Sequence, residues 1–172
     1  GLPGLVRADF EDLRRSRGLG DAKASKLKAI LELARRLNAT QPQERPQITA
    51  PEDVYRLVGS EMAKLDQEQL RVILLDTKNR VVRVVPVYQG SVNSAQVRVA
   101  ELFRDAVRQN VPSIVLVHNH PSGDPQPSRA DAQITRDAVR AGELLGIDVV
   151  DHIVIGDGAY ASLRREGAGF SR

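Results

Sequence analysis

The feature that most constrains this chain is an apolar run that leads directly into two histidines, a loop rich in Pro and Gly, and a long helical pattern. The apolar run at 113–117 is typical of a buried strand, and the helical pattern begins near Ser128. His118 and His120 are separated by one residue on this extended chain, so their side chains point to the same face. We therefore expect two imidazoles to meet at the end of a core strand.

A third side chain able to bind the same metal follows in the sequence. Asp131 lies in the first turn of the predicted helix, and the intervening loop can fold that turn back over the histidines. Two imidazoles and one carboxylate leave the fourth position of a tetrahedral site for water, which is the pattern of catalytic rather than structural zinc. We predict one Zn²⁺ per chain, held by His118, His120 and Asp131. The alternative is that Ser128 and Asp131 form only a capping box and that the histidines are polar residues at a strand end.

Composition excludes several other chemistries. The 172 residues include no cysteine, which rules out disulfides, thiol catalysis and thiolate-bound zinc. Aromatic residues make up 3% of the chain, too few to favour stacking on single-stranded bases. No apolar run approaches the roughly 20 residues of a membrane-spanning helix, and the N-terminus lacks a signal pattern. We predict a cytoplasmic globular protein that does not associate with membranes.

The formal charge of the chain is distributed unevenly. Residues 1–38 contain 9 Lys and Arg against 5 Asp and Glu, a net +4, whereas residues 39–172 contain 16 against 17, a net −1. The segment 39–50 carries prolines and few apolar residues, which is typical of a linker. We predict a small basic module at 1–38, a linker at 39–50 and a catalytic domain at 51–172.

The basic module is predicted to be all-α, with two helices around a tight turn. Asp9 is the expected cap of the first helix and Asp21 that of the second, with Gly18-Leu19-Gly20 between them. This segment resembles part of a helix-hairpin-helix module, whose role in its family is DNA-backbone binding without sequence preference. The resemblance implies that a duplex phosphate would meet the residues around the turn, which are Gly18, Gly20, Lys23 and Lys26. The alternative is an ordinary helical hairpin, and a solvated helix face explains the charge nearly as well.

The catalytic domain alternates strands and helices. Strands are predicted at 69–76, 81–88, 113–118, 147–155 and 160–163; a helix is predicted to start at Pro51, a second short helix to run to about Leu65, and two further helices to span 95–110 and 128–145. Thr49 is the expected cap of the first of these helices, and Gly146 the expected end of the last. The pattern predicts an α/β fold in which a mixed β-sheet is flanked by helices.

A carboxylate is needed to move a proton in zinc-dependent hydrolysis. Glu68 stands immediately before the first predicted strand, Glu101 lies on the helix before the histidine strand, and Glu61 is a third candidate. The residues alone do not separate Glu68 from Glu101. Ser128 has two possible roles, to cap the helix or to donate a hydrogen bond to an oxyanion.

The pattern His118-x-His120, seven residues and Ser128-x-x-Asp131 resembles the JAMM motif of MPN-domain metalloproteases. The longer string at 118–131, with Asp151-His152 later in the chain, resembles the bacterial RadC family. This resemblance implies a cytidine-deaminase-like sandwich in which His118, His120 and Asp131 hold zinc. It further implies that Glu68 is the base, that Ser128 assists the oxyanion, and that an amide, peptide or isopeptide bond of an unidentified protein or peptide is cut. We expect His152 to be a hydrogen-bonded core residue rather than a ligand.

Two other functions remain as alternatives. The first is a DNA-binding accessory protein of DNA repair in which the metal site is structural or vestigial. The second is a metal-dependent nuclease, which is less favoured because two-metal chemistry needs more carboxylates than Asp124 and Asp131. A zinc nucleoside deaminase is excluded, since its Pro-Cys-x-x-Cys element requires cysteines.

Overall fold

The computed structural model of the chain describes residues 2–40, 45–90 and 97–170 and divides into two compact units, Gly1–Glu44 and Arg45–Arg172. This division differs from the predicted linker at 39–50 at both ends. A helix continues to Thr40, and the segment after residue 44 belongs to the second unit. Ile48, which lies in the predicted linker, is 5% exposed and its backbone N–H donates to Asn79 O at 2.8 Å. This residue is therefore part of the core of the second unit.

The first unit contains three helices, α1 (Leu2–Arg7), α2 (Phe10–Arg15) and α3 (Asp21–Thr40). Asp9 caps α2 as predicted, because its Oδ1 accepts a hydrogen bond from Asp12 N at 2.7 Å. Asp21 is not a cap but the first helical residue of α3, and Gly20 O already accepts the helical bond from Ala24 N. The sequence did not predict α1. The helix-hairpin-helix assignment of this unit stays a prediction.

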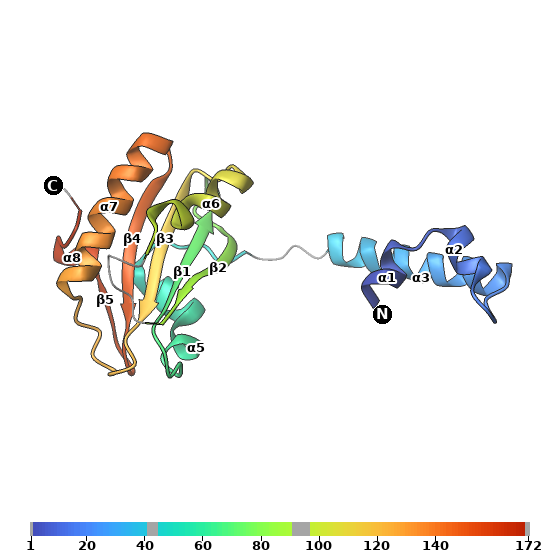
Figure 1. Cartoon of the computed structure of the whole chain (residues 1–172), viewed down its shortest axis with the longest axis horizontal. Coiled ribbons are helices and arrows are strands. Elements are labelled where there is room, and N and C mark those ends of the chain that lie inside the picture. Colours follow the sequence, from blue (N-terminus) through green and yellow to red (C-terminus); the bar gives the residue numbers. More distant parts are fainter. Residues whose placement is uncertain (1, 41–44, 91–96, 171–172) are drawn as a thin grey trace. The chain divides into compact units, whose positions relative to one another are not determined.

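The second unit is built on a five-stranded sheet in the order β2-β1-β3-β4-β5. Its strands are β1 (Gln69–Leu75), β2 (Val81–Gln89), β3 (Ser113–Asn119), β4 (Asp148–Ile155) and β5 (Tyr160–Ser162). β3 and β4 are parallel and every other neighbouring pair is antiparallel, so the predicted mixed sheet is confirmed. β3 lies at the centre of the order, where it pairs with β1 on one side and β4 on the other (Figure 1).

Helices cover both faces of this sheet. One face carries α6 (Val99–Gln109) and α7 (Arg129–Leu145), and α7 runs alongside β4 in Figure 1. The other face carries a continuous helical segment of α4 (Pro51–Val54), the π-helical turn η1 (Tyr55–Gly59) and α5 (Ser60–Met62). A last short helix, α8 (Leu163–Glu166), follows β5. In the described parts of the chain, no helix combines the length and apolar character needed to cross a membrane.

The start of α4 corrects one predicted cap. Ala50, not Thr49, occupies the N-cap position. Thr49 instead donates from its backbone N and from its hydroxyl to Asp53 Oδ2, both at 2.8 Å. Ala50 N donates to the same oxygen at 3.0 Å, so the carboxylate of the third helical residue satisfies the N-terminus from inside the helix.

The side chains of β3 point alternately to the two faces of the sheet. All seven residues of β3 are buried, with Ile114 and Leu116 packed on the α7 side and Val115 and Val117 on the other. His118 takes the next position on the α7 side, as the two-residue period requires. The core packing of β3 therefore fixes the direction of the first candidate ligand.

Candidate metal centre

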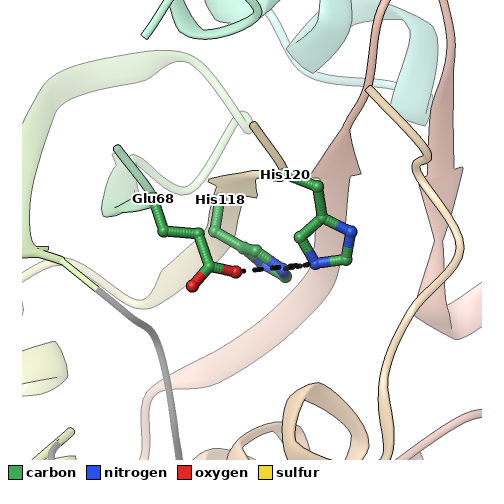
Figure 2. Close-up of side chains that lie close together, drawn as sticks. All are labelled: Glu68, His118 and His120. Atoms are coloured by element: carbon green, nitrogen blue, oxygen red, sulfur yellow. Dashed lines mark hydrogen bonds and ion pairs between the residues drawn. The ribbon is translucent and has the colours of Figure 1, made fainter. Parts of the chain in front are cut away.

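Both predicted histidine ligands lie where β3 ends. The Nε2 atoms of His118 and His120 are 3.0 Å apart, and the two rings converge as in Figure 2. The side chain of His118 is fully buried, whereas that of His120 is 15% exposed. His120 lies one residue beyond the strand, and its backbone N donates to Ile155 O at 2.9 Å, which continues the pairing with β4 past the end of β3.

Asp131 reaches both imidazoles from the first turn of α7. Its Oδ1 lies 3.2 Å from His118 Nε2 and its Oδ2 lies 3.6 Å from His120 Nε2. The capping box is also present, since Ser128 N donates to Asp131 Oδ2 at 2.7 Å and Asp131 N donates to Ser128 Oγ at 3.2 Å. The capping box and the ligand role are therefore compatible. Burial opposes ionisation of Asp131, but hydrogen bonds from His118 and His120 outweigh it and hold the pKa of this carboxyl well below its usual range.

Glu68 brings a second carboxylate to the same point. It stands two residues before Leu70, which pairs with His118 across the β1–β3 ladder, so both side chains face the same side of the sheet. Glu68 Oε1 lies 3.8 Å from His120 Nε2, the contact drawn in Figure 2. Glu68, His118 and His120 each offer a donor atom within 4.8 Å of the others, so these three residues can hold a metal ion.

The other two candidate bases have partners elsewhere. Glu101 lies 3.8 Å from Arg98 on its own helix, and Glu61 accepts a hydrogen bond from Arg71 at 2.7 Å. Among the three glutamates, Glu68 is the one that the structure brings to the histidines.

Two carboxylates thus compete for the position beside the imidazoles. Asp131 is 1% exposed and contacts both rings, while the Glu68 side chain is 21% exposed and its contact with His120 is longer. The zinc–ligand bond length of 2.0–2.2 Å implies that neighbouring donors of a tetrahedral site lie about 3.3 Å apart. The two Nε2 atoms are 3.0 Å apart, Asp131 Oδ1 lies 3.2 Å from His118 and Asp131 Oδ2 lies 3.6 Å from His120, so each of these separations is near that value. Their positions and donor chemistry are therefore compatible with a bound metal ion.

The hydrogen bond on the far side of the His120 ring determines which of its nitrogens carries the proton. His120 Nδ1 lies 2.8 Å from the backbone carbonyl of Asp124. Because a carbonyl only accepts, Nδ1 carries the proton of the neutral ring and Nε2 presents a lone pair. The hydrogen bond with Asp131 raises the pKa of His120, against the opposing effect of burial. In the absence of a metal, a proton is therefore the competing cation at this nitrogen.

His118 is backed by two side chains. Its Nδ1 lies 2.8 Å from His152 Nε2, and His152 Nδ1 lies 2.7 Å from Thr135 Oγ1. His152 is fully buried, as expected of a hydrogen-bonded core residue, and burial lowers its pKa well below the usual value. The ring of His152 is therefore neutral.

A family model described as RadC-like JAB domain matches residues 48–168, which include every residue of this cluster. The chain belongs to the bacterial RadC family. A UPF0758 protein of Chloroflexus aurantiacus is 56% identical over 170 residues, covering 99% of this chain and 74% of the relative. A UPF0758 protein of Roseiflexus castenholzii is 53% identical over 170 residues, covering 99% of this chain and 73% of the relative. The resemblance that the His-x-His motif indicated is confirmed.

In this RadC-family chain, one residue of the site lies between the two histidines and was missed by the sequence analysis. Asn119 is 1% exposed; its Oδ1 accepts from Gln69 N at 2.9 Å and its Nδ2 donates to Gln67 O at 3.2 Å. The two bonds hold the backbone on both sides of Glu68. No spacing rule indicated this clamp, because the partners are 50 and 52 residues away in the sequence.

Thr135 was also missed, although the sequence carried a signal for it. It lies four residues after Asp131, so both side chains occupy the same face of α7. α7 therefore presents the Asp131 carboxylate and, one turn later, the Thr135 hydroxyl to the histidine cluster.

The loop after His120 is fastened to the end of β4. Gly123 has φ +82°, and its backbone O accepts from Asp157 N at 2.8 Å. A Cβ on Gly156 would overlap Gly123 O and would lie 2.8 Å from Pro125 Cδ. Only a glycine at this position lets the loop cross so closely, and the same loop carries the Asp124 carbonyl that orients His120.

The predicted DNA-binding residues lie in the first unit. Gly18 has φ +86°. A Cβ added at Gly18 or at Gly20 would meet no atom within 4 Å, so the space next to both glycines is open. Lys23 Nζ donates to Gly18 O at 3.2 Å, and Lys26 is exposed. The role of these residues toward DNA stays a prediction.

Proposed function

We propose that the chain is a zinc-dependent metallopeptidase that hydrolyses an amide, peptide or isopeptide bond. The observation that carries the proposal is the convergence of His118 Nε2, His120 Nε2 and the Asp131 carboxylate at separations of 3.0–3.6 Å, with Glu68 beside them. Membership of the RadC-like JAB family supports a metal-dependent hydrolase. In this proposal His118, His120 and Asp131 hold the ion.

Bound zinc supplies a Lewis acid that lowers the pKa of a water molecule toward about 7 and polarises a carbonyl group. Glu68 is the proposed general base, because its carboxylate lies at the site yet remains 21% exposed and open to water. It would take a proton at a carboxylate oxygen and return it to the leaving nitrogen. Asp131, which is buried and hydrogen-bonded by Ser128 N, is suited to bind rather than to move a proton.

Ser128 can serve both of its expected roles. Its Oγ accepts the hydrogen bond from Asp131 N, which uses a lone pair and leaves the hydroxyl proton available to a developing oxyanion. A cavity of about 400 Å³ opens beside Glu68 and is lined by Asp66, Gln67, Glu68, Gly90 and Pro121. This volume accommodates a short segment of a substrate chain next to the proposed base.

The test is metal analysis joined to peptidase assays. We expect about one zinc per chain after purification without a chelator or a metal-binding tag, and less metal in the Asp131→Asn variant. Glu68→Gln should keep its zinc and lose turnover of a peptide and isopeptide library by a factor of about 10²–10⁴. Glu101→Gln is the matched control, since its carboxylate pairs with Arg98 instead.

Two results would contradict the proposal. The first is wild-type protein that holds no metal above trace amounts. The second is a Glu68→Gln variant that is as active as the wild type, which would remove Glu68 from the reaction even if zinc is present.

As a second candidate function, we propose that the first unit binds the backbone of duplex DNA. The net charge of +4 over residues 1–38 and the open turn at Gly18, shortly before the 20-residue helix α3, support this proposal. It is compatible with peptidase activity, because the residues concerned belong to a different unit from the metal centre.

A further inference from the structure

A line of three side chains leads from the metal centre into the core between β4 and α7. His118 Nδ1 contacts His152 Nε2 at 2.8 Å, and His152 Nδ1 contacts Thr135 Oγ1 at 2.7 Å. The Thr135 hydroxyl in turn donates to Asp131 O at 2.6 Å. The line therefore ends on the backbone carbonyl of the residue whose side chain contacts His118 from the front.

Every member of this line is sealed from water. His118, Thr135 and His152 are each 0% exposed. A Cβ on Gly169 would come within 2.7 Å of Thr135 Cβ, so the C-terminal segment presses directly on the threonine. No bulk water is present to donate or accept in place of a missing partner, and each hydrogen bond must be completed inside the line.

When His118 binds a metal, the number of protons available determines which group donates in each hydrogen bond of the line. A neutral His118 that ligates through Nε2 must carry its proton on Nδ1. His152 must then accept at Nε2 and carry its own proton on Nδ1. Thr135 Oγ1 must accept from His152, and its hydroxyl proton goes to the Asp131 carbonyl, which is the direction in which that contact lies.

The opposite direction would disable the ligand. If Thr135 donated to His152 Nδ1, His152 would carry its proton on Nε2 and donate to His118 Nδ1. The proton of His118 would then sit on Nε2 and point at Asp131 Oδ1, where the metal must bind.

We propose that Thr135 and His152 are positioning residues that hold His118 in the tautomer with a proton on Nδ1 and a lone pair on Nε2. This inference rests on the proposed function, because it gives His118 the role of a zinc ligand. The helix carbonyl of Asp131 is the anchor, since it accepts the hydroxyl proton of Thr135 and so leaves the Thr135 oxygen to accept from His152.

The test compares Thr135→Val with Thr135→Ser in the full chain. Valine keeps the shape of threonine but removes the hydroxyl, so a proton on His152 Nδ1 would be buried without an acceptor. His152 should therefore move its proton to Nε2 and force that of His118 to Nε2. Serine keeps the hydroxyl and should restore the wild-type arrangement.

Two readouts are needed. Nitrogen-15 NMR of the ring nitrogens in zinc-loaded protein should show protons on Nδ1 of His118 and on Nδ1 of His152 in wild type and Thr135→Ser. Zinc affinity, measured by competition with a chromophoric chelator, should fall about 10–100-fold in Thr135→Val and recover in Thr135→Ser. Denaturant unfolding of the metal-free proteins separates a loss of folding from a loss of binding.

A second pair of variants keeps the test decisive if valine prevents folding. His152→Gln offers a carbonyl oxygen near the position of Nε2 and can accept from His118, whereas His152→Leu offers no acceptor at similar size. We expect the glutamine variant to bind zinc more tightly than the leucine variant.

Unchanged zinc affinity in Thr135→Val, or a proton on Nε2 of His152 in the zinc-loaded wild type, would overturn the inference while leaving the peptidase proposal intact. Failure of serine to restore affinity would also overturn it, because the role of Thr135 would then be packing. Wild-type protein that binds no zinc would instead contradict the proposed function.

Discussion

Removal of the Asn119 side chain should separate the proposed base from the metal. Asn119 accepts from Gln69 N at 2.9 Å and donates to Gln67 O at 3.2 Å, and these contacts hold the backbone on either side of Glu68. Asn119→Ala removes both hydrogen bonds but none of the four side chains of the cluster. The histidines remain fixed by β3, and Asp131 remains fixed by its capping box.

The expected magnitudes follow from the two lost bonds. At about 1 kcal/mol each, they should lower the free energy of unfolding by about 2 kcal/mol. A shift of Glu68 by about 1 Å is enough to reduce kcat by roughly 100-fold, because proton transfer requires the base within hydrogen-bonding reach. Zinc content should stay at the wild-type level.

The assay combines urea unfolding, zinc content and kcat for Asn119→Ala and for a matched control. Gln47→Ala is that control, because it removes a side-chain amide that donates to a backbone carbonyl, Lys78 O at 2.9 Å, away from the metal centre. An Asn119→Ala variant that loses stability but keeps the wild-type kcat would refute the clamp. Loss of zinc from the variant would show that Asn119 supports the ligands instead.

Three further outcomes are expected. Gly156→Ala should displace the loop that crosses it and destabilise the fold by about 1–3 kcal/mol, with weaker zinc binding in a chelator competition; unchanged zinc affinity would contradict the role of the loop. The pKa of His120 is raised in the metal-free protein, so its contact with Asp131 stabilises the fold below the unfolded pKa of about 6.5 and this contribution is lost as pH rises through the raised folded value. Zinc competes with the same proton, so zinc affinity should increase with pH over that window, and a pH-independent affinity would be inconsistent with His120 as a ligand. Reversing the charges of Lys23 and Lys26 to Glu should weaken duplex binding and reduce its salt dependence in a fluorescence anisotropy titration, whereas unaltered binding would remove both lysines from the interface.

The central part of the fold was predictable because its patterns are long. A continuous apolar run leaves little choice but a buried strand at β3, and the sustained periodicity of α7 with Gly146 at its end leaves little choice but a helix. Errors occurred where local signals compete. Thr49 and Ala50 both precede Pro51, and the outcome depended on the Asp53 carboxylate, which bonds both residues.

The choice between candidate bases could not be made from local sequence. Glu68 and Glu101 both stand beside elements of the core, and only the register that pairs Leu70 with His118 brings Glu68 to the histidines. Register is a property of the assembled sheet, set by which faces of the strands are buried. The Asn119 clamp depends on the same pairing and was invisible for the same reason.

The distribution of the cluster over separate elements also has a kinetic consequence. One carboxylate precedes β1, the imidazoles end β3, and Asp131 begins α7, so the donors come together only after the strands have paired and α7 has docked. Loop closure must precede these contacts, which places them late in folding. An ion held by such late contacts stabilises the native state more than the transition state, so it slows unfolding without accelerating folding. In this protein, a bound metal would act as a latch that closes after the fold is complete.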